Sequence, residues 1–551
     1  MKWLKKKGFP KKEDENDTED SSGSEIEDDE PILQEFNDEE KSDINQFNLK
    51  WEEVIKKKET IDFLPQFSRS AGPIYNYEPT AEPIEYFYDF ITENFMQSLA
   101  QYTNEYAKTK IQSFPENSSP SHEKSWEEVT NEEMKCFIGI ILLMGIIRLP
   151  EYTDYWSSKS LLNIISIKEL MSRDRFKQIS RYFHINSPSQ ESSTDKYTKI
   201  RPALDMILFF SQKNYVPSQM LSIDESMIGF KGHHSDVVYM PNKPIKKGFK
   251  AYVLTEARTG YICNWFLFTH NNSDEISNTT VSIVTKLLHG YENAGYIVAM
   301  DRFYTTVELF KVLEAIKIGA VGTINSNRKN LPKEKFQSLK MEINQSVFFQ
   351  SENLILCCFQ DKKRVLLISN CHDTIKIYEQ RIFTMKKQKV SKFVWIPKIL
   401  KDYTKYMGGV DRFDQFIHYY ASSHRSLKWY KRIFYYLLEW AIVNATVIYE
   451  HIMQKNGDKP LSHKEFRLNI IKNLVKPTKT AKNLLETEKK KKSDKKIMEI
   501  IECRLEKSPQ SRAYCAECPS RTSYWCGFHE IAVCAAICYD NHRKKYDLNT
   551  T

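Results

Sequence analysis

The sequence predicts an α/β protein whose central part alternates short strands with helices, preceded by a helical region and followed by a small cysteine-rich module. Three observations support this. From residue 216 onward, β-prone apolar runs alternate with helical patterns. Residues 83–187 place apolar side chains three or four positions apart, as a helix does. After residue 500, six of the chain's 11 cysteines fall close together.

The central strands occur in the order of a ribonuclease H-like core, with three strands, then a helix, a strand, a helix and a strand. The predicted strands are Leu221–Asp224, Ala251–Glu256, Gly260–Thr269, Gly295–Asp301 and Gly319–Ile324, and the predicted helices span 278–292 and 305–317. Strands at Ser346–Gln350, Leu354–Phe359 and Arg364–Ser369 interrupt this order. Residues 330–397 are therefore predicted to be a β-rich insertion.

The same patterns divide the chain into seven parts. These are an acidic tail (1–75), a helical domain (76–215), the first part of the core (216–329), the insertion (330–397), the second part of the core with a long aromatic helix (398–475), a basic linker (476–502) and a cysteine-rich domain (503–551). The tail is predicted to be disordered, because it has few large apolar side chains to offset the entropy of ordering.

Charge is distributed unevenly along the chain. Residues 1–50 hold 16 acidic and 8 basic side chains, a net charge of −8, whereas the whole chain is +8, so residues 51–551 carry +16. A basic body suits a polyanionic partner such as nucleic acid. No signal peptide or membrane span is predicted, since the longest apolar run, 136–147, is shorter than the roughly 20 residues that a bilayer requires. A soluble protein in a reducing, intracellular compartment is expected.

Carboxylates occur in three segments that are far apart in the sequence. Asp224 and Asp301 each end a predicted strand, while Asp411 and Asp414 share one face of a helix that a glycine pair opens. Magnesium or manganese prefers oxygen ligands, and two such ions about 3.5–4 Å apart can stabilise both oxygens of a phosphodiester displacement. The pattern therefore predicts a metal-dependent site for cutting and joining DNA. Glu225 is expected to point to the opposite face of the strand.

The motifs around these aspartates resemble those of the piggyBac-type transposases, from about Pro83 to the C-terminus. They include Tyr155-Trp156-Ser157, Met171-Ser172-Arg173-Asp174-Arg175-Phe176, Ser222-Ile223-Asp224-Glu225-Ser226-Met227, Met240-Pro241-Asn242-Lys243-Pro244, Asp301-Arg302-Phe303-Tyr304-Thr305 and Met407-Gly408-Gly409-Val410-Asp411. A single aspartate after a strand or near a helix start is more often a turn or cap residue. The conjunction of four within these motifs favours a catalytic arrangement.

The resemblance implies that Asp224, Asp301 and Asp411 bind the catalytic metal ions, with Asp414 as a further catalytic carboxylate. It implies cut-and-paste transposition, in which water nicks the transposon end, the freed 3′ hydroxyl attacks the opposite strand to form a hairpin, and the ends later join target DNA at TTAA. The expected partners are double-stranded DNA, as terminal inverted repeats and target sites, and a second copy of the chain, with the helical domain serving dimerisation and DNA binding. No membrane partner is expected.

The C-terminal module holds seven thiol or imidazole groups within 28 residues: Cys515, Cys518, Cys526, His529, Cys534, Cys538 and His542. Pairs separated by two or three residues can bind zinc from a tight turn, and each zinc ion takes four such ligands. Two ions would need an eighth ligand, from Cys503 or an aspartate. By the resemblance this module recognises the transposon ends, while a structural or protein-binding role stays open.

Basic side chains near the core are candidate phosphate contacts, which position a protein on DNA without specifying a sequence. The candidates are Lys243, Lys246, Lys247, Lys250, Arg328, Lys329, Arg425, Lys428 and Arg432. Trp429 and Tyr430 either stack on an unpaired base or belong to the core. The run 489–496 is interpreted as a nuclear import signal in preference to a solvated helix face, so a nuclear location is expected.

Two other functions are alternatives. A domesticated descendant that binds DNA or chromatin without transposing would carry the same motifs. A zinc-finger adaptor or ubiquitin ligase would explain only the C-terminal module. Retention of the four carboxylates favours the enzyme over both.

Overall fold

The computed structural model describes residues 49–54, 63–75, 77–78, 80–113, 126–157, 165–241, 243–270, 279–385, 388–422, 426–475, 505–507, 513–516, 518–526, 531–532 and 538. Most of the predicted acidic tail and the whole basic linker, 476–502, lie outside these residues. Within the described ranges, no helix has both the length and the apolar character needed to cross a membrane.

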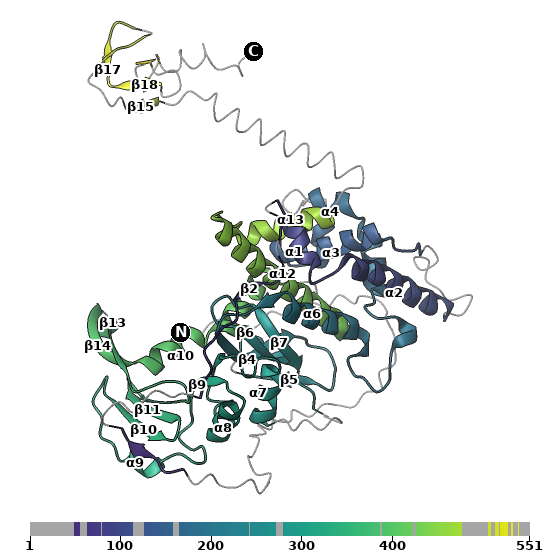
Figure 1. The fold of residues 1–551 in the computed structure, drawn as a ribbon. Coiled ribbons are helices and arrows are strands. Elements are labelled where there is room, and N and C mark those ends of the chain that lie inside the picture. The colour runs from purple at the N-terminus through teal and green to yellow at the C-terminus, as the bar shows by residue number, and fades with distance from the viewer. Residues whose placement is uncertain are drawn as a thin grey trace, which may run out of the picture. The chain divides into compact units, whose positions relative to one another are not determined.

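A mixed ten-stranded sheet forms the centre of the fold (Figure 1). Its strands are β1 (Glu52–Glu53), β4 (Met220–Gly229), β5 (Val237–Tyr239), β6 (Lys247–Glu256), β7 (Ile262–Leu267), β8 (Ile297–Met300), β9 (Gly319–Thr323), β10 (Ser346–Ser351), β11 (Leu354–Gln360) and β12 (Arg364–Ser369). They lie in the order β1-β10-β11-β12-β9-β8-β4-β6-β5, and β7 also pairs with β6.

The predicted ribonuclease H-like core is confirmed by the part of this sheet that runs β7-β6-β4-β8-β9. β6 is antiparallel to β4 and β7, whereas β8 is parallel to β4 and β9. The two predicted helices are present as α7 (Thr280–Leu288) and α8 (Val307–Ala315). β4, the first strand of this core, therefore lies at its centre.

The predicted insertion extends the core sheet instead of forming a separate one. β12 pairs antiparallel with β9, with Ile368 opposite Gly322, so β10, β11 and β12 continue the sheet beyond β9. Without that pairing, β9 would be an edge strand with unpaired backbone groups. After α9 (Lys333–Gln337) and these strands, β13 (Lys376–Met385) and β14 (Gln388–Pro397) form a two-stranded ribbon that was not predicted from the sequence.

Residues 49–54 and 63–75 are ordered against the core, which differs from the expectation that the disordered tail extends to residue 75. The Trp51 indole is buried and donates to the carbonyl oxygen of Asn330 at 2.9 Å. β1 pairs with β10, and β2 (Gly72–Pro73) pairs with β3 (Tyr215–Val216). Trp51, Leu49 and Phe67 of this stretch join the main hydrophobic cluster, and their burial repays the entropy of ordering.

The helical region contains the helices that its periodicity predicts. They are α1 (Pro83–Tyr88), α2 (Glu93–Gln112), α3 (Asn131–Ile146), α4 (Ile165–Leu170), α5 (Arg173–Tyr182) and α6 (Arg201–Lys213), with 3-10 turns η1 (Tyr152–Trp156), η3 (Pro188–Gln190) and η4 (Thr198–Ile200). At the start of α3, the Thr130 side chain accepts from the Glu133 backbone N–H, and the Glu133 carboxylate accepts from the Thr130 N–H. These two reciprocal hydrogen bonds form a capping box, which fixes the start of the helix.

Four helices complete the core: α10 (Lys398–Tyr406), α11 (Gly409–Tyr420), α12 (Trp429–Asn456) and α13 (His463–Leu474). The predicted aromatic helix is α12, which is buried along most of its length. Its Glu439 pairs with Arg467 of α13, and both side chains are buried. One continuous hydrophobic cluster includes α12, the helical region and the central strands, so the site described next is built on a rigid base.

Candidate active site

Two of the predicted aspartates lie at the carboxyl ends of neighbouring parallel strands. Ile223 of β4 is opposite Met300 of β8, so Asp224 and Asp301 are the next residues on strands about 4.8 Å apart. The backbone N–H of Phe303 donates to Asp301 Oδ1 at 2.8 Å and restrains that side chain. Parallel pairing therefore brings together two carboxylates that are distant in the sequence.

The other two aspartates belong to α11, whose first residues pack directly on β4 and β6. Gly409 permits this contact, because a Cβ at that position would lie 2.5 Å from the Thr255 hydroxyl oxygen and 3.0 Å from the Ser222 Cβ. The Ser222 hydroxyl donates to the Met407 carbonyl oxygen at 2.7 Å and holds the residues that precede the helix. The glycine pair noted in the sequence thus sets how closely α11 approaches the sheet.

Asp414 is tied to β4 and α12 by hydroxyl groups. Its Oδ1 accepts hydrogen bonds from Ser226 and, at 3.2 Å, from the Tyr436 hydroxyl. Ser226 follows Asp224 by two residues and therefore lies on the same face of β4. Asp411, one turn before Asp414, is exposed.

A lysine ammonium lies among these carboxylates. Lys243 Nζ is 3.6 Å from Asp224 Oδ1 and 3.7 Å from Glu225 Oε2. Burial alone would lower the pKa of Lys243, but Asp224, Glu225, Asp414 and Asp411 together raise it. We refer to these four carboxylates together with Asp301 as the acidic cluster. Lys243 was predicted as a DNA contact, and the structure directs it toward this cluster.

Glu225 belongs to the acidic cluster, which contradicts the expectation that it points away from Asp224. Its carboxylate is 3.2 Å from Lys250 Nζ and shares Lys243 with Asp224. The pairing of β8 with β4 ends at Ile223, so from Asp224 onward β4 has a neighbouring strand on one side only. The open side leaves room for both side chains to reach the same ammonium.

Burial and mutual repulsion disfavour the charged form of three carboxylates in this cluster. Burial, followed by the charge of Glu225, raises the pKa of both Asp224 and Asp301. Burial likewise raises the pKa of Asp414 to about 6. Burial alone would also raise the pKa of Glu225, but Lys250 and the other nearby groups hold it below its usual range. Three carboxylates with raised pKa values favour the binding of a cation.

The donor set fits hard divalent cations, since every member of the acidic cluster offers carboxylate oxygens. Lys243 shows that a positive charge is accommodated among them. In the described part of the chain, only cysteines bring three ligand atoms within 4.8 Å of one another. The carboxylates therefore surround a wider space, which here receives the lysine ammonium.

Several hydroxyl groups around the acidic cluster were not predicted. Ser222 and Ser226 alternate with Asp224, and this two-residue spacing is a signal that places them on one strand face. The hydroxyls of Tyr403 and Thr323 lie 3.2 Å apart and connect α10 with β9. No local sequence pattern indicates this second pair, because its members come from distant segments.

Among the predicted DNA contacts, Lys247, Lys329 and Lys428 are exposed, as phosphate contacts must be. Arg425 lies outside the described residues. DNA binding by these side chains stays a prediction.

Two of the predicted arginine contacts are engaged within the protein. Arg328 donates to the carbonyl oxygen of Phe303 at 2.7 Å and supports the turn that follows Asp301. Arg432 donates to the carbonyl oxygens of Gly229 at 3.0 Å and Ser422 at 3.1 Å. In this structure both side chains restrain backbone next to the acidic cluster.

Trp429 packs in an aromatic group at the start of α12. Its ring centroid is 4.9 Å from that of His234, 5.7 Å from that of Tyr197 and 6.3 Å from that of Phe249. The side chain is partly exposed, whereas Tyr430 is buried. The structure thus places Tyr430 in the core and leaves Trp429 partly accessible.

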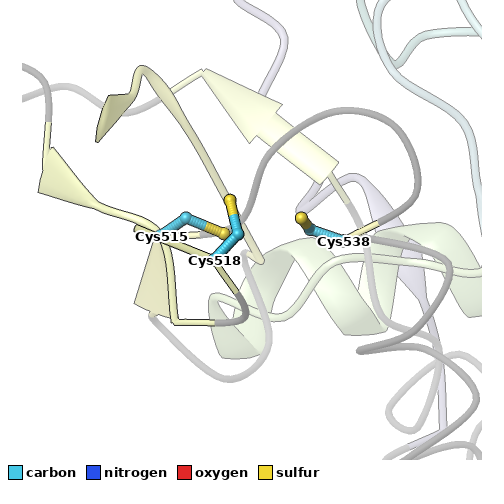
Figure 2. Close-up of side chains that lie close together, drawn as sticks. All are labelled: Cys515, Cys518 and Cys538. Atoms are coloured by element: carbon cyan, nitrogen blue, oxygen red, sulfur yellow. The ribbon is translucent and has the colours of Figure 1, made fainter. Parts of the chain in front are cut away.

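The predicted zinc ligands are partly described. β16 (Ala513–Tyr514) and β17 (Arg521–Thr522) form a hairpin with Cys515 and Cys518 in its turn. The sulfur atoms of these two residues and Cys538 lie within 4.8 Å of one another (Figure 2). We call these three residues the cysteine cluster. Its tight-turn pair is the arrangement that a tetrahedral zinc site uses.

Thiol groups at this spacing interact strongly. A hydrogen bond with Cys518, followed by burial and the contact with Cys515, raises the pKa of Cys538 to about 12. A metal ion would relieve this effect, because it binds the thiolate form. The soft sulfur donors therefore fit zinc.

Of the other four predicted zinc ligands, only Cys526 belongs to the described residues. Cys526 ends β18 (Tyr524–Cys526), which pairs with β15 (Leu505–Lys507) and β19 (Ile531–Ala532). His529, Cys534 and His542 lie outside the described residues, as does Cys503.

Comparisons with known proteins agree with this architecture. A family model described as "Transposase IS4" matches residues 82–446. PiggyBac transposable element-derived protein 3 of Homo sapiens is 24% identical over 469 residues, which cover 82% of this chain and 74% of the relative. PiggyBac transposable element-derived protein 2 of Homo sapiens is 26% identical over 383 residues, covering 66% and 60%.

A solved structure has the same fold. It is described as the cryo-EM structure of a piggyBac transposase synaptic complex with hairpin DNA. The TM-score is 0.63 at 23% identity, and the match covers 85% of this chain and 99% of the other.

Proposed function

This chain belongs to the piggyBac family of transposases, and on that premise we propose that it is a metal-dependent DNA transposase that acts by cut and paste. The family resemblance seen in the sequence motifs is thereby confirmed. One observation carries the proposed activity: β4, the end of β8 and the start of α11 bring their carboxylates around a single ammonium. No local structural need explains so many carboxyl groups at one place.

In this proposal Asp224, Asp301 and Asp411 hold magnesium or manganese, and Asp414 is a further catalytic carboxylate. A bound divalent cation supplies Lewis-acid activation and charge neutralisation for phosphodiester displacement. Asp414 fixes the start of α11 against β4 through Ser226, which keeps Asp411 at the open side of the cluster.

Lys243 and Lys250 have complementary roles in the proposal. Lys250 compensates the negative charge of Glu225. Glu225 therefore contributes less uncompensated charge than the neighbouring carboxylates do. Lys243 approaches the acidic cluster from the loop that follows β5, and its ammonium can contact a phosphate that enters the same space. This agrees with its predicted role as a phosphate contact.

The proposed substrates are double-stranded DNA, as transposon terminal inverted repeats and as TTAA target sites. The net charge of +16 over residues 51–551 supports a polyanionic substrate. The similar solved structure is a synaptic complex with hairpin DNA, which supports the same substrate class and a second copy of this chain as partner. A nuclear location follows from such a substrate and from the basic run at 489–496.

We further propose that zinc binds the cysteine cluster and the neighbouring predicted ligands. The module would then present one face for recognition of the transposon ends. Support comes from the three sulfur atoms within 4.8 Å and from the turn geometry of Cys515 and Cys518.

The test is excision, measured in cells from a donor plasmid carrying this gene's own flanking DNA. Wild type should excise the element, and Asp301→Asn should not, while both bind the element's ends. Asp205→Asn is the matched control, since Asp205 is an exposed carboxylate on α6 away from the acidic cluster.

Loss of excision in Asp301→Asn alone would support the transposase. Undiminished excision by Asp301→Asn would contradict the assignment of the site. Specific binding to the flanks without any excision, even by wild type, would favour a DNA-binding descendant over the enzyme.

A further inference from the structure

The β13–β14 ribbon carries an aromatic surface that nothing in the described protein covers. Tyr378 of β13 is opposite Trp395 of β14, and Phe393 is two residues further along the same face. The Tyr378 ring is 5.2 Å from that of Trp395 and 5.3 Å from that of Phe393, with an interplanar angle of 26° to the latter. We call these three side chains the aromatic face.

All three rings are exposed to solvent in spite of their size. Tyr378 is 59% exposed, Phe393 56% and Trp395 58%. The opposite face of the ribbon is used differently, since Ile377, Val394 and Ile396 pack on a hydrophobic cluster below it. Contiguous exposed aromatic groups of this kind mark an interaction surface, because leaving them in water costs free energy.

The ribbon is also strongly basic. Residues 376–397 contain six basic side chains and one acidic side chain. The acidic one, Glu379, is paired with Lys401 at 3.2 Å, and Arg381 lies 3.5 Å from Asp361, while Lys392 is exposed on the face opposite the rings. A ribbon with this basic composition that also exposes aromatic rings is complementary to nucleic acid, which offers phosphates and flat bases.

A single helix, α10, follows the ribbon and leads toward the acidic cluster. Figure 1 shows α10 beside β13 and β14. β14 leads directly into α10, and the Lys398 N–H donates to the Ile375 carbonyl oxygen at 2.9 Å at the ribbon's base. At its other end α10 reaches Met407, which is bonded to Ser222 beside Asp224. The nine residues of α10 span about 14 Å, which is a few nucleotides of DNA.

We propose that the aromatic face binds unpaired bases of a DNA strand next to the position of strand cleavage. Bases inside a duplex are stacked on one another, so the rings can stack only on bases that are unpaired. The inference rests on the proposed function in taking DNA as the substrate of the acidic cluster, and it adds a binding surface to that site.

A second copy of this chain is a less suitable occupant of the aromatic face. Two basic ribbons brought together would repel each other, and the aromatic face offers only three side chains. A stable protein interface needs a considerably larger area.

The experiment uses the full-length protein and a short oligothymidylate strand, with a duplex of equal length for comparison. Stacking should quench the emission of Trp395, and the difference between wild type and Trp395→Phe isolates that signal from the other tryptophans. The triple variant Tyr378→Ala, Phe393→Ala, Trp395→Ala should bind the single strand at least about tenfold more weakly. Its affinity for the duplex should change little.

Phe209→Ala is the matched control, because Phe209 is 55% exposed on α6 and lies beside Lys213. It should bind the single strand as wild type does. Thermal unfolding of every variant confirms that the fold is kept, which is expected for exposed positions.

Three outcomes would overturn the proposal. They are the absence of a Trp395 quenching signal, unchanged single-strand binding by the triple variant, and a change in the triple variant's oligomeric state by light scattering. The last would assign the aromatic face to self-association. Binding is measured without catalysis, so a chain that fails to excise DNA can still pass this test, and the two proposals fail separately.

Discussion

The acidic cluster and the cysteine cluster are both suited to metal ions, but they are assembled in opposite ways. The carboxylates come from β4, β8 and α11 and are held by a large hydrophobic core. The cysteines come from one short stretch, with two of them in a single hairpin turn. The surrounding fold holds the acidic cluster in place, whereas the cysteine module is expected to depend on its metal site for folding.

The difference shows how metal binding and folding are coupled in each region. Repulsion among buried carboxylates is tolerated because the packing around them is extensive. The cysteine module has strands of two or three residues and cannot bury a comparable core. We therefore expect metal removal to leave the acidic cluster folded and the cysteine module unfolded.

The largest expected effect is the loss of structure in the cysteine module when zinc is removed. Structural zinc contributes on the order of 10 kcal/mol of folding free energy in small modules. Cys518→Ser or a zinc-selective chelator should release zinc and expose residues 505–538 to protease, while the thermal transition of the core is unchanged. Cys136→Ser, which alters a cysteine on α3, should retain zinc. A core that melts together with the module would show that the two regions are not independent.

The next effect is on chemistry at the acidic cluster. Asp224→Asn removes a charge from the centre of the site without changing its shape, and loss of metal-dependent stabilisation worth several kcal/mol should lower excision by about a thousandfold. Binding to the transposon ends and the thermal transition should remain. Excision within a few fold of wild type would exclude Asp224 as a metal ligand.

A smaller effect concerns the approach of α11 to the sheet. Gly409→Ala places a methyl group 2.5 Å from the Thr255 hydroxyl oxygen, so the helix must shift, at a cost of about 1–3 kcal/mol and with reduced excision. Gly408→Ala is the matched control, since a Cβ there meets nothing within 4 Å. Denaturant unfolding of both variants measures the difference. Equal stability of the two would show that α11 is free to adjust.

The smallest effect is a pH dependence of stability at Asp414. Its folded pKa of about 6 exceeds the ordinary value of 3.8, so the folded state binds this proton more tightly than the unfolded chain. The stability it contributes is full below pH 3.8 and is lost as pH rises through about 6. Asp414→Asn, which does not titrate, should therefore gain stability relative to wild type as pH rises through this range, by on the order of 1–3 kcal/mol.

Urea unfolding in a chelator, on both sides of this pH range, measures that gain. Asp458→Asn alters an exposed carboxylate outside the cluster and should show no such trend. Added magnesium should stabilise wild type more than Asp414→Asn. A relative gain for Asp414→Asn that grows toward acid pH would reverse the expected sign.

Local sequence patterns predicted those parts of the protein that depend on neighbouring residues. Apolar spacing indicated the strands and helices of the ribonuclease H-like core. Aspartates at strand ends and a glycine pair before Asp411 indicated the carboxylate positions. Closely spaced cysteines predicted a cluster that needs only a short turn to form. Each of these signals lies within a few residues of chain.

Features that depend on which distant segments meet were visible only in the tertiary structure. Glu225 joined the acidic cluster because the pairing of β8 with β4 ends one residue before Asp224. Lys243 lies among the carboxylates because the loop after β5 returns to β4. The insertion extended the sheet because β9 offered an unpaired edge, and the rings of the β13–β14 ribbon are exposed because no described residue covers them. Strand neighbours, pairing limits and uncovered faces are set by the packing of the whole chain, and no local period in the sequence records them.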